Sequence, residues 1–256
     1  MLSRTRSGVQ RMIELYNNDC LEIMPQISDG SIDMILCDLP YGTTHNKWDS
    51  VIPFDKLWKE YERIIKRNGA ICLFADGMFM ADLMNSNRKM WRYNLVWNKV
   101  LTSGFLNAKR MPLRNTEEIC VFYKKLPTYN PQFTEGEPLH GRGTSLVTKG
   151  CQNNNYGEYN MANPVITLRE GSTQKYPKSL LTFRRPHSSV MLHPTEKPVE
   201  LMEWLIKTYT NEGETVLDNC MGSGSVGVAC KNLNRNFVGI EIDEKYFEIA
   251  RNRIKE

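Results

Sequence analysis

The sequence contains no long hydrophobic run, and this absence excludes one class of protein at the outset. No apolar stretch among the 256 residues approaches the roughly 18 that a membrane-spanning helix needs. The first residues, Met1 to Gly8, also lack the apolar stretch of a secretion signal. We therefore expect a chain that neither spans a membrane nor is exported.

The cysteines form no recognisable pattern. No Cys-x-x-Cys pair and no Cys/His spacing typical of a zinc site occurs among the seven, which are Cys20, Cys37, Cys72, Cys120, Cys151, Cys220 and Cys230. The sequence therefore indicates neither a metal site nor a disulfide framework. An odd number of cysteines without an export signal fits a reducing cytoplasm.

Charge of neither sign dominates. The formal net charge is +4, which permits a polyanionic partner without demonstrating one. Basic residues gather in two places, and the members are Lys99, Lys109, Arg110 and Arg114, then Lys175, Lys178, Arg184, Arg185 and His187. Each cluster is equally well explained as a solvated face. The 41% of hydrophobic and 24% of charged residues are typical of a soluble globular protein.

What the chain does contain is a repeated alternation of strand and helix patterns. The expected strands cover 32–37, 70–74, 93–97, 118–123, 214–218 and 236–241. The expected helices cover 54–66, 78–85, 198–209, 225–233 and 243–254, and Asn68-Gly69 is expected to stop the first of them. This order predicts an α/β fold with a doubly wound, mostly parallel sheet that could carry an antiparallel edge.

The alternation of strand and helix patterns is interrupted between residues 127 and 186. This stretch is rich in Asn, Gly, Pro, Tyr, Thr and Lys and has weak periodicity. A structureless loop of that length is unusual inside a compact domain, so an inserted functional region is expected. A solvated insertion or a dimer contact would also explain the composition.

A glycine-rich turn near the C-terminus resembles a nucleoside-cofactor site. Gly222 to Gly227 fits G-x-G-x-x-G between a strand and a helix, where glycines Gly222 and Gly224 let the backbone approach a ligand. Glu241 ends the next strand and can accept hydrogen bonds from ribose hydroxyls. Asp218 ends the preceding strand, where a carboxylate can meet the ammonium of a methionine group. The pattern fits S-adenosylmethionine better than a dinucleotide, although tight helix–strand packing would need the same glycines.

A second motif lies near the N-terminus, directly after the strand 32–37. Asp38 offers a side-chain acceptor, and Pro40 keeps Leu39 extended so that the Leu39 carbonyl can supply another. Two such acceptors can hold the hydrogens of a base amine and free the nitrogen lone pair. Tyr41 offers an aromatic face for a base swung out of a helix. Alone, this tetrapeptide would also suit an ordinary turn after a strand.

Together the two motifs resemble the DNA amino-methyltransferases in which the catalytic motif precedes the cofactor motif. Members of that family carry D/N/S-P-P-Y/F/W where this chain has Asp38-Leu39-Pro40-Tyr41. Leucine in place of the first proline keeps the backbone carbonyl. The leading Asp resembles the members that act on adenine, whereas Ser is commoner in those that make N4-methylcytosine.

The resemblance extends to two further segments. In Asn18-Asp19-Cys20-Leu21, the family places an acidic residue near the adenine of the cofactor, which makes Asp19 with Cys20 the candidates here. A helix N-cap would be the ordinary reason for Asp19. In the segment 193–198, Thr195 and Lys197 are the candidates for holding the carboxylate of the cofactor. The segment 42–49 ends near Trp48 and resembles a loop that closes over DNA, unless Trp48 packs into the core.

The resemblance implies a Rossmann-like methyltransferase with S-adenosylmethionine as cofactor and double-stranded DNA as partner. The expected product is N6-methyladenine, made without a metal. The expected organisation is an N-terminal arm (1–13), a catalytic domain (14–126 and 187–256) and a target-recognition insertion (127–186). The arm is either a lead-in or a basic segment that touches DNA.

Several alternatives stay open on the sequence. Methylation of cytosine N4 or of RNA would use the same cofactor, whereas a nicotinamide-dependent oxidoreductase would leave Asp38 to Tyr41 unexplained. A DNA-binding module without enzymatic activity would not need the glycine turn. The sequence is compatible with a homodimer but gives neither the oligomeric state nor an accompanying restriction enzyme.

Overall fold

The computed structural model describes residues 12–43, 49–138, 171–187, 189, 191–193 and 195–255. The chain divides into two compact units. The first comprises Met1–Asn130 and Ser179–Glu256, and the second comprises Pro131–Lys178. In the second unit, the described residues form a short antiparallel ribbon of β6 (Thr134–Glu135) and β7 (Gln174–Lys175).

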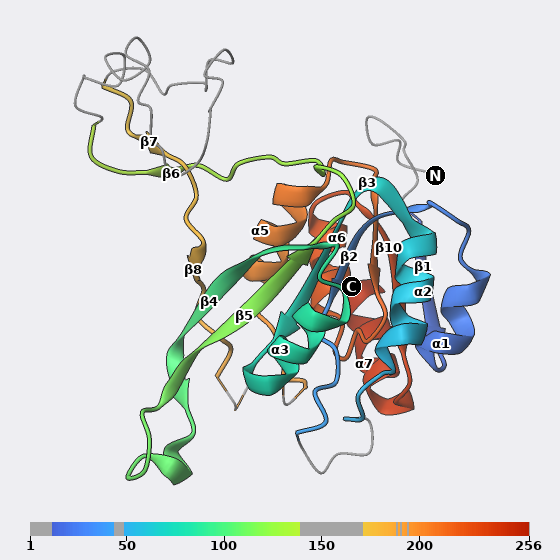
Figure 1. Ribbon diagram of the computed structural model, residues 1–256, viewed down its shortest axis with the longest axis horizontal. Coiled ribbons are helices and arrows are strands. Elements are labelled where there is room, and N and C mark those ends of the chain that lie inside the picture. The colour runs from blue at the N-terminus through green and yellow to red at the C-terminus, as the bar shows by residue number, and fades with distance from the viewer. Residues whose placement is uncertain are drawn as a thin grey trace, which may run out of the picture. The chain divides into compact units, whose positions relative to one another are not determined.

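The first unit is built on one sheet with strand order β1-β10-β9-β2-β3-β5-β4-β8 (Figure 1). The strands are β1 (Ile13–Asn17), β2 (Ile32–Cys37), β3 (Ile65–Ala75), β4 (Trp91–Ser103), β5 (Arg114–Phe122), β8 (Leu180–Thr182), β9 (Thr215–Asp218) and β10 (Asn236–Glu241). Neighbours pair in parallel except at β5, which is antiparallel to both β3 and β4. The expected mostly parallel sheet is confirmed, but its reversed strand lies inside the sheet rather than at an edge.

Helices cover both faces of this sheet. They are α1 (Cys20–Ile23), α2 (Phe54–Ile64), α3 (Gly77–Ser86), α5 (Val199–Tyr209), α6 (Ser225–Asn232) and α7 (Glu244–Lys255), with short 3-10 turns η1 (Met24–Gln26) and η2 (Phe105–Asn107). No helix among the described residues is long and apolar enough to cross a membrane.

The central strand β2 shows why the fold is doubly wound. All six of its residues are buried. Side chains alternate across a strand, so Ile35 and Cys37 join the core with α2, while Met34 and Leu36 join the core with α5. A strand that is apolar on both faces needs a helical layer on each side, because one exposed face would leave its side chains in water.

One helix boundary differs from the expectation. Helix α2 ends at Ile64 rather than Lys66, and β3 begins at once with Ile65. Ile65 pairs with Ile32, but the next pair is Met34 with Ala70, so the stretch containing Asn68 forms an irregularity within the strand pairing. Asn68-Gly69 therefore interrupts the β2–β3 ladder instead of stopping a helix, because the pairing partner decides where the chain becomes extended.

Strands β4 and β5 are longer than expected. β4 runs to Ser103 and β5 starts at Arg114, and together they form a hairpin whose turn contains η2. The polar residues in these extensions hide the alternation that identifies a strand from sequence. The edge strands β1 and β8 were not expected either, since each is short and only partly buried.

Candidate active site

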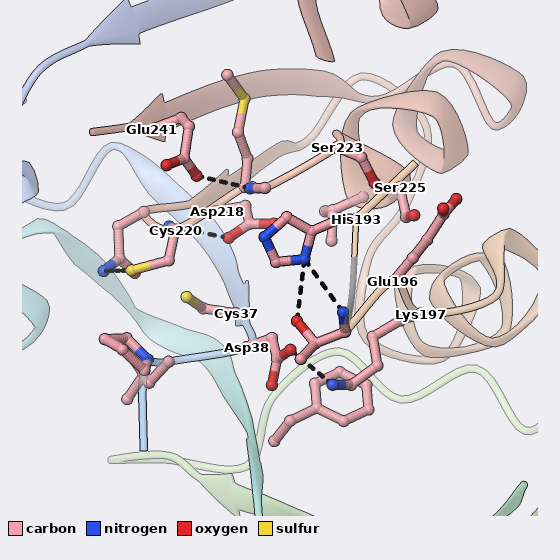
Figure 2. Close-up of a pocket in the computed structure, with 18 of the residues that line it drawn as sticks. Cys37, Asp38, His193, Glu196, Lys197, Asp218, Cys220, Ser223, Ser225 and Glu241 are labelled. Atoms are coloured by element: carbon pink, nitrogen blue, oxygen red, sulfur yellow. Dashed lines mark hydrogen bonds and ion pairs between the residues drawn. The ribbon is translucent and has the colours of Figure 1, made fainter. Parts of the chain in front are cut away.

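A cavity of about 370 Å³ opens at the carboxyl ends of β2, β9 and β10 in the first unit. In doubly wound sheets, ligands bind beyond the carboxyl ends of the strands. Figure 2 shows Glu241 at one end of this cavity, Asp38 and Lys197 at the other, and Asp218 and His193 between them. The two motifs separated by most of the sequence therefore line one cavity.

Both oxygens of Asp38 are engaged in the structure. The hydroxyl of Tyr41 lies 3.0 Å from Oδ1, and the ammonium of Lys197 donates to Oδ2 at 2.6 Å. The Tyr41 hydroxyl is also 3.1 Å from Oε1 of Glu117, and its single proton serves one acceptor at a time. Because a carboxylate has about four lone-pair positions, Asp38 keeps the capacity to accept a further hydrogen bond from a ligand.

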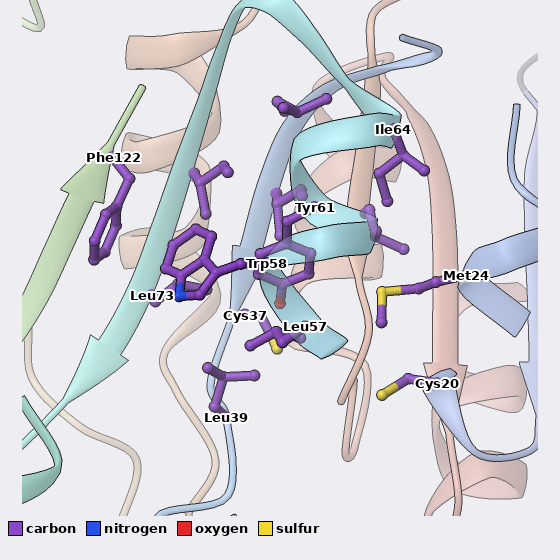
Figure 3. Close-up of a cluster of buried hydrophobic side chains, with 14 of the residues drawn as sticks. Cys20, Met24, Cys37, Leu39, Leu57, Trp58, Tyr61, Ile64, Leu73 and Phe122 are labelled. Carbon is purple, nitrogen blue, oxygen red and sulfur yellow. The ribbon is translucent and has the colours of Figure 1, made fainter. Parts of the chain in front are cut away.

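The backbone and ring of the Asp38 motif are held from behind. The side chain of Leu39 is only 4% exposed and joins the hydrophobic cluster beneath α2, as Figure 3 shows. The ring of Tyr41 stacks on Phe79 of α3, with 4.7 Å between ring centroids. This packing restricts the backbone at Leu39 and the plane of the Tyr41 ring.

Lys197 joins two carboxylates. Its ammonium lies 2.6 Å from Asp38 and 3.0 Å from Glu117, and it sits 4.9 Å from the centroid of the Phe74 ring. Lys99 adds a second cation 3.7 Å from Glu117. The cluster thus balances two negative with two positive side chains. Our expectation that Lys197 holds the cofactor carboxylate stays a prediction, but its observed partners are Asp38 and Glu117.

Burial and charge act in opposite directions on this cluster. Burial raises the pKa of Asp38, and the ammonium of Lys197 opposes that effect. Burial also acts to raise the pKa of Glu117, but Lys197 and Lys99 outweigh it, so that its pKa is lowered. The pKa of Lys197 is raised because its two carboxylates outweigh its burial. These shifts keep Glu117 and Lys197 charged, and Lys197 favours the ionised form of Asp38.

Glu117 is the site residue that sequence reasoning missed. It lies on β5, where it is 9% exposed and is one of the residues that line the cavity. The available signal was a pair of acids, Glu117-Glu118, at the start of an apolar strand. Lys99, noticed only as part of a basic cluster, lines the same cavity.

At the opposite end, Glu241 holds the glycine turn. Its two oxygens accept from the backbone N–H of Gly222 and of Asp243, each at 2.8 Å. Burial raises the pKa of Glu241, and these two backbone donors oppose the effect. The same carboxylate lines the cavity, so it has lone pairs available on the cavity side.

Asp218 is the most deeply buried acid of the cofactor motif. It is 3% exposed, and its Oδ1 accepts from the backbone N–H of Cys220 at 3.1 Å. Burial is the largest effect on it and raises its pKa to about 7. A carboxyl group held near its titration point in a cavity is typical of a ligand-binding position.

The two glycines of the turn have different surroundings. Gly222 has φ +50° and lies beside the His193 ring at the cavity. Gly224 has φ +81°, and a Cβ there would lie 2.9 Å from the Cβ of Ala250 on α7. Gly224 is not among the residues that line the cavity. Its observed role is to let α6 and α7 pack closely, and its assignment to the cofactor stays a prediction.

The remaining candidates also line the cavity. Asp19 caps α1 through a hydrogen bond of 2.8 Å from the backbone N–H of Leu21, and Cys20 follows it at 6% exposure. The Thr195 hydroxyl is 3.0 Å from Nδ1 of His193. Burial lowers the pKa of His193 to about 4, so the imidazole is neutral at pH 7.

Some expectations fall on residues outside the described ranges. These are residues 44–48 of the expected closing loop, which include Trp48, residues 1–11 of the N-terminal arm, and residues 139–170 of the expected insertion. Arg185, from the second basic cluster, lies in the first unit and lines the cavity.

A doubly wound sheet with a glycine-rich turn and acidic strand ends around one cavity defines an α/β enzyme that binds a nucleoside cofactor. A family model described as "DNA methylase" (N6_N4_Mtase) matches residues 32–252, so the chain belongs to this family of DNA methylases. The resemblance inferred from the two motifs is therefore confirmed.

Individual relatives agree with this family. The Type II methyltransferase M.HpaI of Haemophilus parainfluenzae is 27% identical in an alignment of 254 residues, which covers 94% of this chain and 73% of the relative. The M1.HpyAVI–SAM complex has a TM-score of 0.61 at 23% identity and covers 94% of this chain and all of that chain. The cytosine-N4-specific PvuII DNA methyltransferase has a TM-score of 0.65 at 14% identity, covering 94% and 86%. These structural likenesses confirm the Rossmann-like methyltransferase fold.

Proposed function

We propose that this DNA methylase transfers a methyl group from S-adenosylmethionine to the N6 amine of adenine in double-stranded DNA. One observation carries the proposal: Asp38, an acceptor for an amine, shares a single cavity with the buried acids Asp218 and Glu241. The choice of adenine over cytosine depends on the leading Asp of the motif, which resembles the adenine-specific members of the family.

The donor set of the cavity fits S-adenosylmethionine. This cofactor carries ribose hydroxyls, an ammonium and a sulfonium, and buried carboxylates attract both hydrogen-bond donors and cations. Glu241 suits the ribose hydroxyls and Asp218 suits the ammonium, while Asp19 and Cys20 line the part assigned to the adenine ring. When bound, the cofactor supplies an electrophilic methyl group.

The residues around Asp38 prepare the amine for attack. Asp38 and the Leu39 carbonyl accept its two hydrogens, which favours a tetrahedral nitrogen with an available lone pair. Tyr41, backed by Phe79, stacks on the extruded base. Lys197 favours the ionised form of Asp38, which is the form that accepts. Asp38 need not be a strong base, because the methylated ammonium is acidic enough to lose its proton readily.

Product analysis tests this proposal directly. Unmethylated DNA and RNA are incubated separately with the protein and isotope-labelled S-adenosylmethionine, digested to nucleosides and analysed by mass spectrometry. We expect label in N6-methyldeoxyadenosine only. Label in N4-methyldeoxycytidine or in RNA would show that cytosine or RNA is a substrate, contrary to the proposal. No incorporation of label at all would reject methyl transfer.

Replacing Glu241 tests the position of the cofactor. We expect Glu241→Ala to weaken S-adenosylmethionine binding, because up to two charge-assisted hydrogen bonds of about 1.5–3 kcal/mol each are lost. Glu241 also accepts from Gly222 and Asp243, so Glu241→Gln, which keeps one acceptor oxygen, is the matched control and should lose less. Calorimetry that finds unchanged affinity in both variants would contradict this placement.

The raised pKa of Asp218 predicts a pH dependence. With a pKa of about 7, the carboxyl is half ionised near pH 7 and mostly protonated at lower pH, and a cationic ligand prefers the ionised form. Affinity for S-adenosylmethionine should therefore rise with pH, by up to about tenfold per unit, and level off above pH 7. The pKa of His193 is about 4, which lies below the pH range over which Asp218 ionises. Calorimetry between about pH 5 and pH 8, the range in which proteins are generally most stable, measures how this affinity changes with pH.

Asp218→Asn serves as the control for this pH dependence. Its amide does not ionise, so the slope should flatten and affinity at high pH should fall. Persistence of the same slope in Asp218→Asn would assign the titration to another group, such as Glu241.

We also propose that residues 127–186 choose the DNA sequence and contribute little to the chemistry. The candidates to scan are Arg142, Lys149, Lys175, Lys178, Arg184 and Arg185. Replacing a phosphate-contacting residue should weaken binding on all sequences and reduce its salt dependence, whereas replacing a base-reading residue should relax the methylated site. If the DNA affinity, its salt dependence and the methylated sequence are all unchanged after the six substitutions, sequence recognition must lie in another part of the chain.

A further inference from the structure

The hairpin of β4 and β5 departs from the sheet next to the active site. Regular pairing ends at Asn98 with Thr116 and resumes at Ser103 with Arg114. Within this bulge, Val100 has φ +64° and is 48% exposed. Positive φ is strained for a β-branched residue, and such bulges redirect strands near functional sites.

The bulge separates a buried part of the hairpin from an exposed tip. Lys99 and Glu117 lie on the cavity side and belong to the charge cluster around Asp38. Phe105 lies six residues after Lys99, and an extended chain of six residues reaches at most about 20 Å. Figure 1 shows the hairpin tip extending past α3, away from the rest of the sheet.

Several apolar side chains of the tip stay largely uncovered by the described residues of the first unit. Phe105 is 68% exposed, Leu106 101% and Met111 50%. The backbone nevertheless forms an ordered turn, with Asn107 and Arg110 donating to the carbonyls of Gly104 and Asn107 at 2.9 and 2.8 Å. An ordered turn that presents a phenylalanine and a leucine to water is typical of a contact surface.

The charge of the tip favours a polyanion as the occupant. Its only charged residues, from Gly104 to Leu113, are Lys109 and Arg110. Both are exposed, and within the described ranges neither has an ion pair. Two free cations beside two apolar side chains fit the chemistry of a DNA duplex, whose phosphates surround a stack of apolar base faces.

We propose that this tip enters DNA beside the target base, with Phe105 and Leu106 against the base stack and Lys109 and Arg110 on the flanking phosphates. The inference rests on the proposed action on double-stranded DNA. Extruding a base costs pairing and stacking, and an apolar wedge that occupies the opened step lowers that cost. A hairpin that leaves the active site at Lys99 is placed to contact the same stretch of duplex.

The test uses the full chain and a duplex oligonucleotide that carries the methylated sequence, identified by sequencing DNA that the protein has methylated. The duplex is prepared fully paired and with a mismatched base opposite the target. The double variant Phe105→Ser/Leu106→Ser should lose about 10- to 100-fold in kcat/KM on the paired duplex. On the mismatched duplex, where the target is already unpaired, it should stay within about threefold of the unmodified protein.

The other end of the hairpin offers matched controls. Leu126 is 78% exposed just beyond β5, so Leu126→Ser should methylate both duplexes normally. Lys109→Gln/Arg110→Gln should weaken binding to both duplexes and reduce its salt dependence, whereas Lys125→Gln should not. Cofactor affinity, measured by calorimetry, should be unchanged in every tip variant.

Three results would overturn the inference. In the first, the double variant keeps normal kcat/KM on the paired duplex. In the second, its kcat/KM falls equally on the paired and the mismatched duplex. In the third, its oligomeric state changes and its methylation of DNA does not. The last result would indicate a second copy of the chain as occupant. If the unmodified protein methylated no DNA, the proposed function itself would fail, which the product analysis detects independently.

Discussion

Asp38→Ala is expected to abolish methyl transfer to DNA while leaving affinity for S-adenosylmethionine largely intact. Asp38 is the side-chain acceptor assigned to the target amine, whereas Glu241 and Asp218 line the cofactor end of the cavity. Removal of one hydrogen-bonding group positioned at the reacting atoms costs roughly 10²–10³-fold in rate. A tritiated-methyl assay measures turnover, and calorimetry measures cofactor affinity.

The variant should fold, because Lys197 keeps Glu117 as a partner at 3.0 Å. Asp38→Asn is the matched comparison: its amide oxygen still accepts but carries no charge, so residual activity above that of Asp38→Ala is expected. Full turnover by a well-folded Asp38→Ala protein would contradict the assignment of Asp38 to the amine.

Lys197→Met should reduce methylation sharply at neutral pH and shift the pH–rate profile towards alkaline pH. Without the ammonium, burial and the neighbouring Glu117 both raise the pKa of Asp38. A protonated Asp38 donates a hydrogen bond where the amine needs an acceptor. Activity should therefore recover as pH rises through the new pKa. Loss of one partner from a buried ion pair also costs about 3–5 kcal/mol of stability.

A second substitution distinguishes this electrostatic role from simple structural damage. In Lys197→Met/Glu117→Gln, the repulsion from Glu117 is removed, so the pKa of Asp38 should fall and activity should partly return. Measurement of kcat against pH for both variants decides the matter. If Lys197 instead holds the cofactor carboxylate, the single variant should lose affinity for S-adenosylmethionine and keep its pH profile.

The positions of the two motifs could be predicted because each is local. Asp38 follows the short apolar strand β2 and Asp218 ends β9, and parallel strands place their carboxyl ends at one edge of a sheet. The periodicity of the strands and the placement of the glycines then suffice to bring Asp38 and the glycine-rich turn to the same edge. The family resemblance rests on the same local features, and the family model matches residues 32–252.

The partners of Lys197 could not be predicted in this way. It lies 159 positions from Asp38 in the chain, and its second carboxylate comes from β5. Whether Glu117 reaches the cavity depends on β5 running antiparallel between β3 and β4. An acidic side chain such as Glu117 within a strand carries no sequence signal for the direction of its strand or for the ammonium that will neutralise it.

The sequence thus determined the class of fold, the order of the motifs and the acids at the strand ends, because these follow from local periodicity and backbone preferences. Only the tertiary structure decided which charges meet. It placed Lys197 and Lys99 among Asp38 and Glu117, and it exposed Phe105 and Leu106 beyond a strained bulge. Burial and long-range pairing set these features, and both arise only when distant segments share one core.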